Sequence, residues 1–244
     1  MTRRRWIADE VSGNRAALIG EHARHLVQVL RAQVGQEFDI STGSEVRRGR
    51  VAVIRPERVE FELGASVVHS AMTAITVALS IFKFDRMEWA IEKCTELGVS
   101  GIVPVVASRT ESHLAAAAAK RVERWQRIAK QASEQARRIS PPEISAPIKF
   151  KELLAKSDSP RIALSETEQN VLLKDAIPGD ANLLLLAFGP EGGWTQEEIT
   201  AFRDEEWTSA SLGNTILRAE TAVIAAVAIA GAVLTQPLSP RTES

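Results

Sequence analysis

The sequence has 244 residues, of which 45% are apolar and 25% are charged, and its formal net charge is −1. These proportions are typical of a globular protein and exclude a disordered chain or a uniformly basic nucleic-acid binder. The longest apolar run, residues 222–234, is too short to span a bilayer, and the N-terminus has no apolar stretch that could act as a signal peptide. Because Cys94 is the only cysteine, no internal disulfide can form. We therefore expect a cytoplasmic protein.

Residues 1–72 predict a small β-rich domain. Short alternating runs indicate strands at residues 37–40, 50–54 and 59–63, separated by glycine and proline turn signals. One helix is expected at 21–31, because the apolar residues of this segment cluster on one helical face. A small barrel is the natural closure for so many short strands.

Residues 73–236 predict an α/β domain. The expected strands are 74–82, 102–106, 161–165, 182–188 and 209–212, and the expected helices are 85–97, 120–138, a short one between the third and fourth strands, one from 195, and 220–234. Strands that alternate with helices predict a mostly parallel sheet with helices on both faces. Cys94 falls on an apolar helix face and is expected in the core. The remaining residues, 237–244, are expected to be a disordered tail.

The expected helix at 120–138 is strongly basic, with seven Lys and Arg residues against two Glu. A basic stripe on a neutral protein suits contact with a phosphate backbone on one face. A solvated helix face would show the same pattern, so the charge alone leaves both interpretations open.

A glycine-rich turn, Gly189-Pro190-Glu191-Gly192-Gly193, directly follows the strand expected at 182–188. At the carboxyl end of a buried parallel strand, such a turn exposes backbone amides where α/β sheets bind ligands. Thr195 and Glu198 have the spacing of a capping box that begins the next helix. Taken alone, the pentapeptide could also be only a tight turn.

A second segment, Ser211–Ala222, leaves the last expected strand through a glycine turn and enters a wholly apolar helix. Arg218 and Glu220 stand at the start of this helix, where charged groups are costly unless they are paired or functional. Glu220 could also simply favour the positive N-terminal end of the helix dipole. The two interpretations are compatible.

At these two segments the sequence closely resembles the RsmE family of rRNA methyltransferases, which belongs to the SPOUT class of knotted enzymes. The matching motifs are the turn Gly189–Gly193 and the run Leu212–Ala222. Further matches follow in family order at Arg24–Arg31, Met87-Glu88, Glu92-Lys93, Thr95–Val99 and Glu134-Gln135. The resemblance implies a PUA-like RNA-binding barrel at 1–72 and, at 73–236, a SPOUT domain with a trefoil knot in its mostly parallel sheet.

The resemblance also implies S-adenosyl-L-methionine as the cofactor and methylation of N3 of a uridine in 16S rRNA of the small ribosomal subunit. The residues implied in cofactor binding are Leu164, Ser165, Gly189, Pro190, Glu191, Gly192, Gly193, Leu212, Gly213, Ile216, Leu217, Thr221 and Ala222. Glycine turns let a ligand approach the backbone without side-chain collision. No Cys/His cluster exists in the sequence, and no metal is expected.

The catalytic hypothesis gives Arg218 the role of stabilising developing charge or orienting the base, with Glu191 and Glu220 nearby. The expected RNA contacts are Arg3, Arg4, Arg5, His25, Arg31, Gln135 and Arg138, although Arg137 competes with its neighbour Arg138 for the position that faces RNA. The knotted class further implies a homodimer.

Two rival functions remain at this stage. Another SPOUT enzyme could methylate a ribose 2′-hydroxyl or a tRNA. A non-catalytic RNA-binding protein could keep the barrel and an inactive pocket. The intact motifs Gly189–Gly193 and Leu217–Thr221 argue against the second.

Overall fold

The computed structural model describes residues 5–67, 74–156 and 160–234. The chain divides into two compact units, which we call the first unit (Met1–Ala71 with Lys130–Pro141) and the second unit (Met72–Ala129 with Pro142–Ser244). This division groups residues 130–141 with the N-terminal part of the chain, whereas the sequence places them inside 73–236. The expected tail 237–244 lies outside the described residues.

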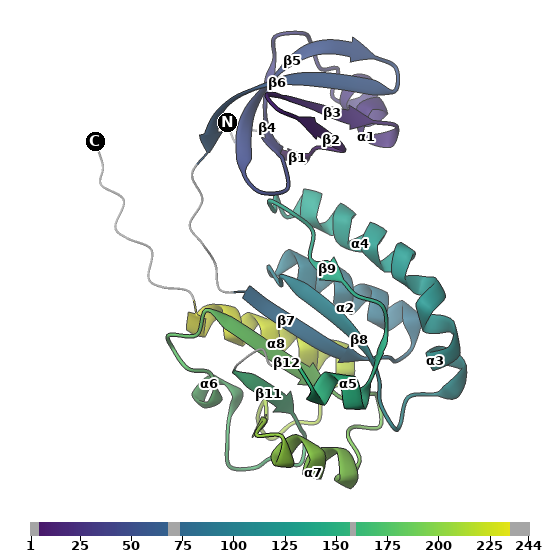
Figure 1. Cartoon of the computed structure of the whole chain (residues 1–244), viewed down its shortest axis with the longest axis vertical. Helices are drawn as coiled ribbons and strands as arrows, with labels where there is room; N and C mark the ends of the chain where they lie inside the picture. Colours follow the sequence, from purple (N-terminus) through teal and green to yellow (C-terminus); the bar gives the residue numbers. More distant parts are fainter. Residues whose placement is uncertain (1–4, 68–73, 157–159, 235–244) are drawn as a thin grey trace. The chain divides into compact units, whose positions relative to one another are not determined.

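The first unit is built on a six-stranded sheet in the order β1-β4-β5-β6-β3-β2 (Figure 1). Its elements are β1 (Arg5–Ile7), β2 (Glu10–Ser12), β3 (Arg15–Ile19), α1 (Glu21–Arg24), the π-helix η1 (His25–Val29), β4 (Glu37–Ser41), β5 (Val46–Arg55) and β6 (Arg58–Val67). Neighbouring strands are antiparallel except β1 and β4. Leu18, Leu26, Ile40 and Phe61 are fully buried in its core. The three expected strands are confirmed within β4, β5 and β6.

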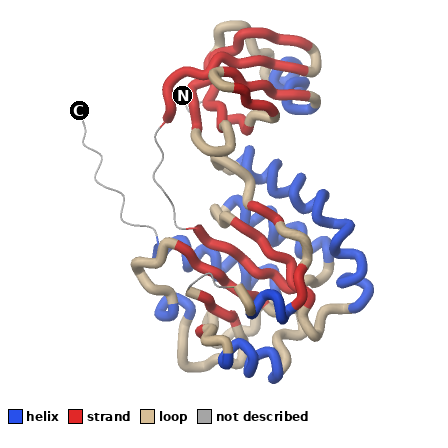
Figure 2. Tube along the Cα trace, viewed as in Figure 1, coloured by secondary structure: helices blue, strands red, loops and turns tan. Residues whose placement is uncertain are grey.

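The second unit contains a seven-stranded sheet in the order β10-β8-β7-β12-β11-β13, with β9 also paired to β8, and every pairing in it is parallel. Its elements are β7 (Ala74–Ser80), α2 (Phe84–Glu96), β8 (Gly101–Val106), α3 (Ser112–Ala118), the 3-10 helix η2 (Ala119–Arg121), α4 (Val122–Gln135), β9 (Glu143–Ile144), β10 (Ile148–Lys149), α5 (Phe150–Leu154), β11 (Arg161–Leu164), α6 (Leu173–Ala176), β12 (Leu183–Phe188), α7 (Gln196–Asp204), β13 (Thr208–Ala210) and α8 (Ala219–Leu234). The last turns of α4, from Lys130, belong to the first unit. Figure 2 shows the strands of the sheet between helices.

Apolar side chains cover both faces of this sheet. Along β12, Leu184, Leu186 and Phe188 face a cluster that includes residues of α2 and α8, whereas Leu185 and Ala187 face a cluster with residues of α5 and α7. A strand that is buried on both faces needs an unbroken apolar run, which explains the sequence of β12. The predicted α/β class is therefore confirmed.

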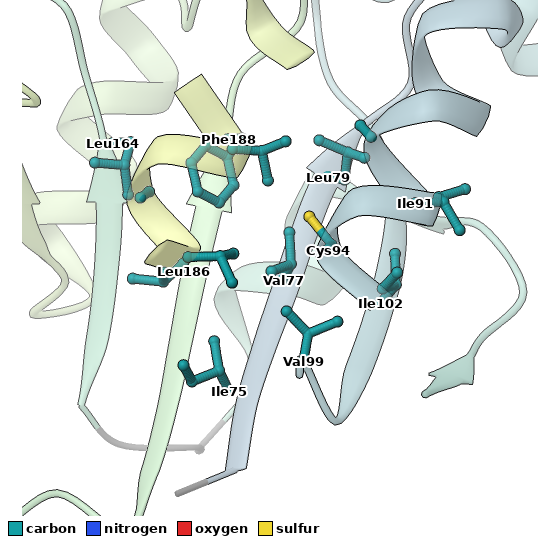
Figure 3. Close-up of a cluster of buried hydrophobic side chains, with 14 of the residues drawn as sticks. Ile75, Val77, Leu79, Ile91, Cys94, Val99, Ile102, Leu164, Leu186 and Phe188 are labelled. Carbon is teal, nitrogen blue, oxygen red and sulfur yellow. The ribbon is translucent and has the colours of Figure 1, made fainter. Parts of the chain in front are cut away.

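Cys94 lies in α2, beside Val77 and Leu79 of the central strand β7 (Figure 3). Only 1% of it is exposed, and burial raises the pKa of its thiol to about 12. The prediction that Cys94 is a core residue is confirmed. Among the described residues, no helix is both long and apolar enough to cross a membrane, and the apolar helix α8 has 16 residues.

Candidate functional site

A cavity of about 420 Å³ lies where the parallel strands β11, β12 and β13 end, a size within the range of small-molecule sites. Because parallel strands end at the same edge of a sheet, the segments that follow them come together there. The walls of the cavity are formed by the segments that follow β11, β12 and β13 and by the start of α2. The lining residues are Lys83, Arg86, Leu164–Thr167, Phe188–Glu191, Gly193, Trp194, Ile199, Ser211–Gly213, Thr215–Ala219 and Ala222.

The turn Gly189–Gly193 needs its glycines. Gly193 has a φ of 70°, and a Cβ there would lie 2.9 Å from Oε1 of Glu166. A Cβ on Gly189 would lie 3.2 Å from backbone atoms of Gly193 and Trp194. Side chains at these positions would therefore strain the backbone or fill the space between the turn and the end of β11.

Neighbouring groups fix this turn in place. The Arg109 guanidinium, which follows β8, donates to the carbonyls of Gly192 and Trp194. The indole N–H of Trp194 donates to the carbonyl of Leu164 at 3.0 Å and so ties the turn to β11. Thr195 and Glu198 form the capping box that the sequence predicts, and α7 begins at Gln196, directly after Thr195.

The segment from Ser211 to Arg218 forms a second wall of the cavity. The Ser211 backbone exchanges hydrogen bonds of 2.9 Å with Val171 and Leu173, which hold the start of the segment beside α6. Gly213 has a φ of 115°, a conformation that side chains other than glycine rarely adopt. Ile216 is 82% exposed although it is apolar. The segment ends at α8, whose first turn contains the buried Glu220.

Arg86 connects the turn Gly189–Gly193 to the start of α8, where the second wall ends. From the first turn of α2, its Nη1 donates to Oε1 of Glu191 at 3.0 Å, and its Nε lies 3.8 Å from Oε1 of Glu220. The Glu220 side chain is only 9% exposed, and its Oε2 is buried without a hydrogen-bond partner among the described residues. The Arg86 cation and the N-terminus of α8 are both positive groups that compensate this carboxylate.

The structure brings most of the predicted cofactor residues together. All of them line the cavity except Gly192 and Thr221, which are exposed on the same two segments. Of the three catalytic candidates, Arg218 and Glu191 line the cavity, while Glu220 is turned toward Arg86.

Ten of the lining residues were not site candidates from the sequence, and four of them, Lys83, Arg86, Glu166 and Thr167, come from the segments after β7 and β11. All four follow the carboxyl end of a parallel strand, either β7 or β11. That position was a usable signal, because ligands bind at this edge of α/β sheets.

The candidate RNA contacts that the structure describes all belong to the first unit. Arg5 donates to the carbonyl of Arg137, and His25 and Arg31 are exposed on the sheet domain. Gln135 and Arg137 are exposed, whereas Arg138 is half-buried and burial lowers its pKa. Arg3 and Arg4 lie outside the described residues.

Ion pairs compensate part of the basic helix. Arg121 and Arg124 both pair with Glu88 of α2, the latter at 2.6 Å. Lys130 pairs with Asp9 at 2.6 Å within the first unit. The basic stripe that the sequence predicts is therefore partly a set of structural ion pairs.

His22 is the centre of a charged cluster in the first unit. Its Nδ1 lies 2.9 Å from Oδ2 of Asp9, and its Nε2 forms an ion pair of 3.1 Å with Glu134 of α4. The hydrogen bond to Asp9, followed by the Glu134 carboxylate, raises the pKa of His22 to about 9. The cluster joins α1 and the loop after β1 to the segment that carries Gln135 and Arg138.

Known proteins resemble this chain over most of its length. The family model for an RNA methyltransferase domain matches residues 69–231. The ribosomal RNA small subunit methyltransferase E of Synechocystis is 33% identical over 86% of this chain and 70% of its own length, and that of Aquifex aeolicus is 29% identical over 91% and 96%.

Two solved structures are also similar. The ribosomal RNA small subunit methyltransferase E of Neisseria gonorrhoeae, bound to S-adenosylmethionine, is 31% identical with a TM-score of 0.81, and covers 93% of this chain and 96% of its own. A protein of Legionella pneumophila in complex with the same cofactor is 25% identical with a TM-score of 0.82, over 95% and 98% of the two chains.

Proposed function

The chain belongs to the ribosomal RNA small subunit methyltransferase E family and is an S-adenosylmethionine-dependent rRNA methyltransferase, and we propose that the atom it methylates is N3 of a uridine in 16S rRNA. The observation that carries the proposal is the cavity itself, which is built from the two family motifs, Gly189–Gly193 and Leu212–Ala222. The target atom is implied by the family, and two of the three proposed catalytic residues, Arg218 and Glu191, line the cavity.

The cavity suits the proposed cofactor. The space beside Gly193 would be filled by a Cβ, and the turns at Gly189–Gly193 and Gly213 present backbone groups rather than side chains. The lining carries charges of both signs, Glu166 and Glu191 as carboxylates and Lys83, Arg86 and Arg218 as cations, which suits a ligand with both cationic and anionic groups. We propose that the predicted cofactor residues hold S-adenosylmethionine here. The bound cofactor supplies an electrophilic methyl group, and the protein has to position the acceptor against it.

N3 lies on the Watson–Crick edge of uracil, so the base must be unpaired and presented out of any helix. Loss of the N3 proton leaves negative charge on the ring. We propose that the exposed Arg218, at the cavity wall, stabilises that charge and orients the base. Glu191 and Glu220 complete the proposed catalytic group, and both lie within ion-pair distance of Arg86.

For RNA binding we propose the first unit as a PUA-like domain, with Arg3, Arg4, Arg5, His25, Arg31, Gln135 and Arg138 as contacts. Support comes from the grouping of residues 130–141 with this unit, which joins candidates far apart in sequence. Arg137 is the more exposed of the two neighbouring arginines and is a further candidate.

We also propose a homodimer, a trefoil knot in the second unit and a cytoplasmic location, where ribosomal subunits are found. The exposed apolar Ile216 beside the cavity, together with Trp89 at 47% exposure, supports a dimer, because a second copy would remove these side chains from water. The knot rests on the family resemblance.

Methyl transfer from labelled S-adenosylmethionine to small ribosomal subunits that lack the modification tests the proposal. We expect incorporation by the protein and a loss of at least about 100-fold in turnover for Arg218→Ala, with cofactor affinity retained. Full turnover by Arg218→Ala would remove Arg218 from the catalytic group. Cofactor binding without transfer to any RNA would favour a non-catalytic RNA-binding protein.

A further inference from the structure

The turn Gly189–Gly193 contains three glycines and therefore has more conformational freedom than an ordinary turn. A preformed cofactor site requires that this freedom be removed before the ligand arrives. Two arginines contact the turn from the ends of neighbouring strands. Arg109, after β8, donates to a carbonyl of the turn and to the carbonyl of the next residue, whereas Arg86, after β7, donates to its one charged side chain, Glu191.

The two arginines differ in what else they contact in the candidate site. Arg109 donates to the carbonyls of Gly192 in the turn and of Trp194 directly after it. Arg86 also reaches Glu220 in the first turn of α8, through a different nitrogen of the same planar guanidinium. A planar fork with several donors can hold two carboxylates in fixed positions, which a lysine ammonium does less well.

The position of Glu220 makes this bridge more than a surface ion pair. A buried carboxylate is costly unless it is compensated, and Oε2 of Glu220 has no hydrogen-bond partner among the described residues. Arg86 and Glu191 are each about one-third exposed and line the cavity, whereas the buried Glu220 does not. Arg86 therefore contacts both the cavity and the buried carboxylate.

We propose that Arg86 is a positioning residue that links the turn Gly189–Gly193 to the N-terminus of α8 and so preforms the cofactor cavity. Because Leu212–Ala222 runs into α8, the bridge couples both cofactor motifs to α2. This inference rests on the proposed function only where it assigns the cavity to the cofactor, since the coupling itself is a property of the protein alone.

Hydrogen exchange without cofactor tests the coupling directly. In Arg86→Ala we expect faster amide exchange both in residues 189–194 and in residues 216–223. In Arg109→Ala only the first segment should exchange faster. Arg124→Ala is the matched control, because it breaks a shorter arginine–carboxylate bridge to the same helix α2, at Glu88, away from the cavity, and it should change neither segment.

Cofactor affinity, measured by calorimetry, provides the second readout. Arg86→Ala should weaken S-adenosylmethionine binding by about tenfold or more, the scale typical of lost coupling between sites, while Arg86→Lys should be intermediate and Arg124→Ala unchanged. If Arg86 acts partly through Glu191, the double variant Arg86→Ala/Glu191→Ala should lose less affinity than the sum of the losses of the two single variants.

Unchanged exchange near residue 220 in Arg86→Ala, or additive losses of affinity in the double variant, would overturn the proposal. If Arg86→Ala does not fold, Arg86→Lys and Glu191→Gln decide by the same two measurements. Wild-type protein that bound no cofactor would refute the proposed function instead, and the exchange pattern would still decide the role of Arg86.

Discussion

Replacing His22 with glutamine is expected to remove most of the pH dependence of stability that the first unit shows between pH 7 and 10. In the folded protein the imidazolium lies between Asp9 and Glu134, and its side chain is only 21% exposed. Its pKa is raised from an ordinary value of 6.5 to about 9, so folding favours the protonated form. The stabilisation is therefore complete below pH 6.5 and is lost as the pH rises through 9.

The magnitude follows from the size of this shift. Each pKa unit corresponds to about 1.4 kcal/mol, and the linkage relation gives about 2.5 kcal/mol of stabilisation at pH 7 relative to pH 10 and above. Solvent screening at a partly exposed site reduces this, so we expect about 2 kcal/mol. Glutamine keeps a donor for one carboxylate but carries no charge. The free energy of unfolding of His22→Gln should therefore be lower than that of the wild type at pH 7 and nearly constant between pH 7 and 10.

Urea unfolding between pH 6 and 10, followed by tryptophan fluorescence, measures the effect. Trp6 is the one tryptophan of the first unit, so the difference between the protein and its Trp6→Phe variant isolates the signal of that unit. His113→Gln is the matched control, because His113 pairs with Glu111 on the surface at 71% exposure and should show no such change. Parallel pH profiles for the wild type and His22→Gln would refute the reasoning.

Three further outcomes are expected. Gly193→Ala must adopt a φ of 70° against Glu166, so its affinity for S-adenosylmethionine should fall by at least about tenfold in calorimetry, and unchanged affinity would contradict the cavity assignment. Leu186→Ala, at a fully buried position of β12, should lower the free energy of unfolding by about 2–5 kcal/mol, and a loss below 1 kcal/mol would argue against that packing. Arg31→Ala, at an exposed position, should reduce the slope of log RNA affinity against log salt concentration by about 1, and an unchanged slope would remove Arg31 from the interface.

The elements with strong periodicity or clear end signals could be predicted from the sequence. The helix expected at 85–97 is α2, and Gly98 follows it with a φ of 96° as its C-terminal signal requires. The helix expected at 220–234 is α8, one residue longer at its start. The helix expected at 120–138 is shorter, Val122–Gln135, and two short helices precede it.

Several short elements were not predicted, because they depend on tertiary contacts. The strands β9 and β10 have two residues each and exist as pairings with β8. The expected helix at 21–31 begins as α1, continues as the π-helix η1 and ends at Val29, and no local pattern distinguishes these helix types.

The site was predictable where residues are consecutive and unpredictable where the fold brings distant residues together. The turn Gly189–Gly193 and the run Leu212–Ala222 could be read directly as motifs. Arg86 is separated from Glu191 by more than one hundred residues, and only the parallel pairing of β7 with β12 brings their strand ends to the same edge. The grouping of residues 130–141 with the first unit likewise has no local signal.

The identity of the methylated nucleoside tests the central claim most directly. The protein is incubated with methyl-labelled S-adenosylmethionine and small ribosomal subunits that lack the modification, and the 16S rRNA is then digested to nucleosides and separated. Label in 3-methyluridine, absent with Arg218→Ala, is the predicted result. Label in a ribose-methylated nucleoside would contradict the assignment to uridine N3.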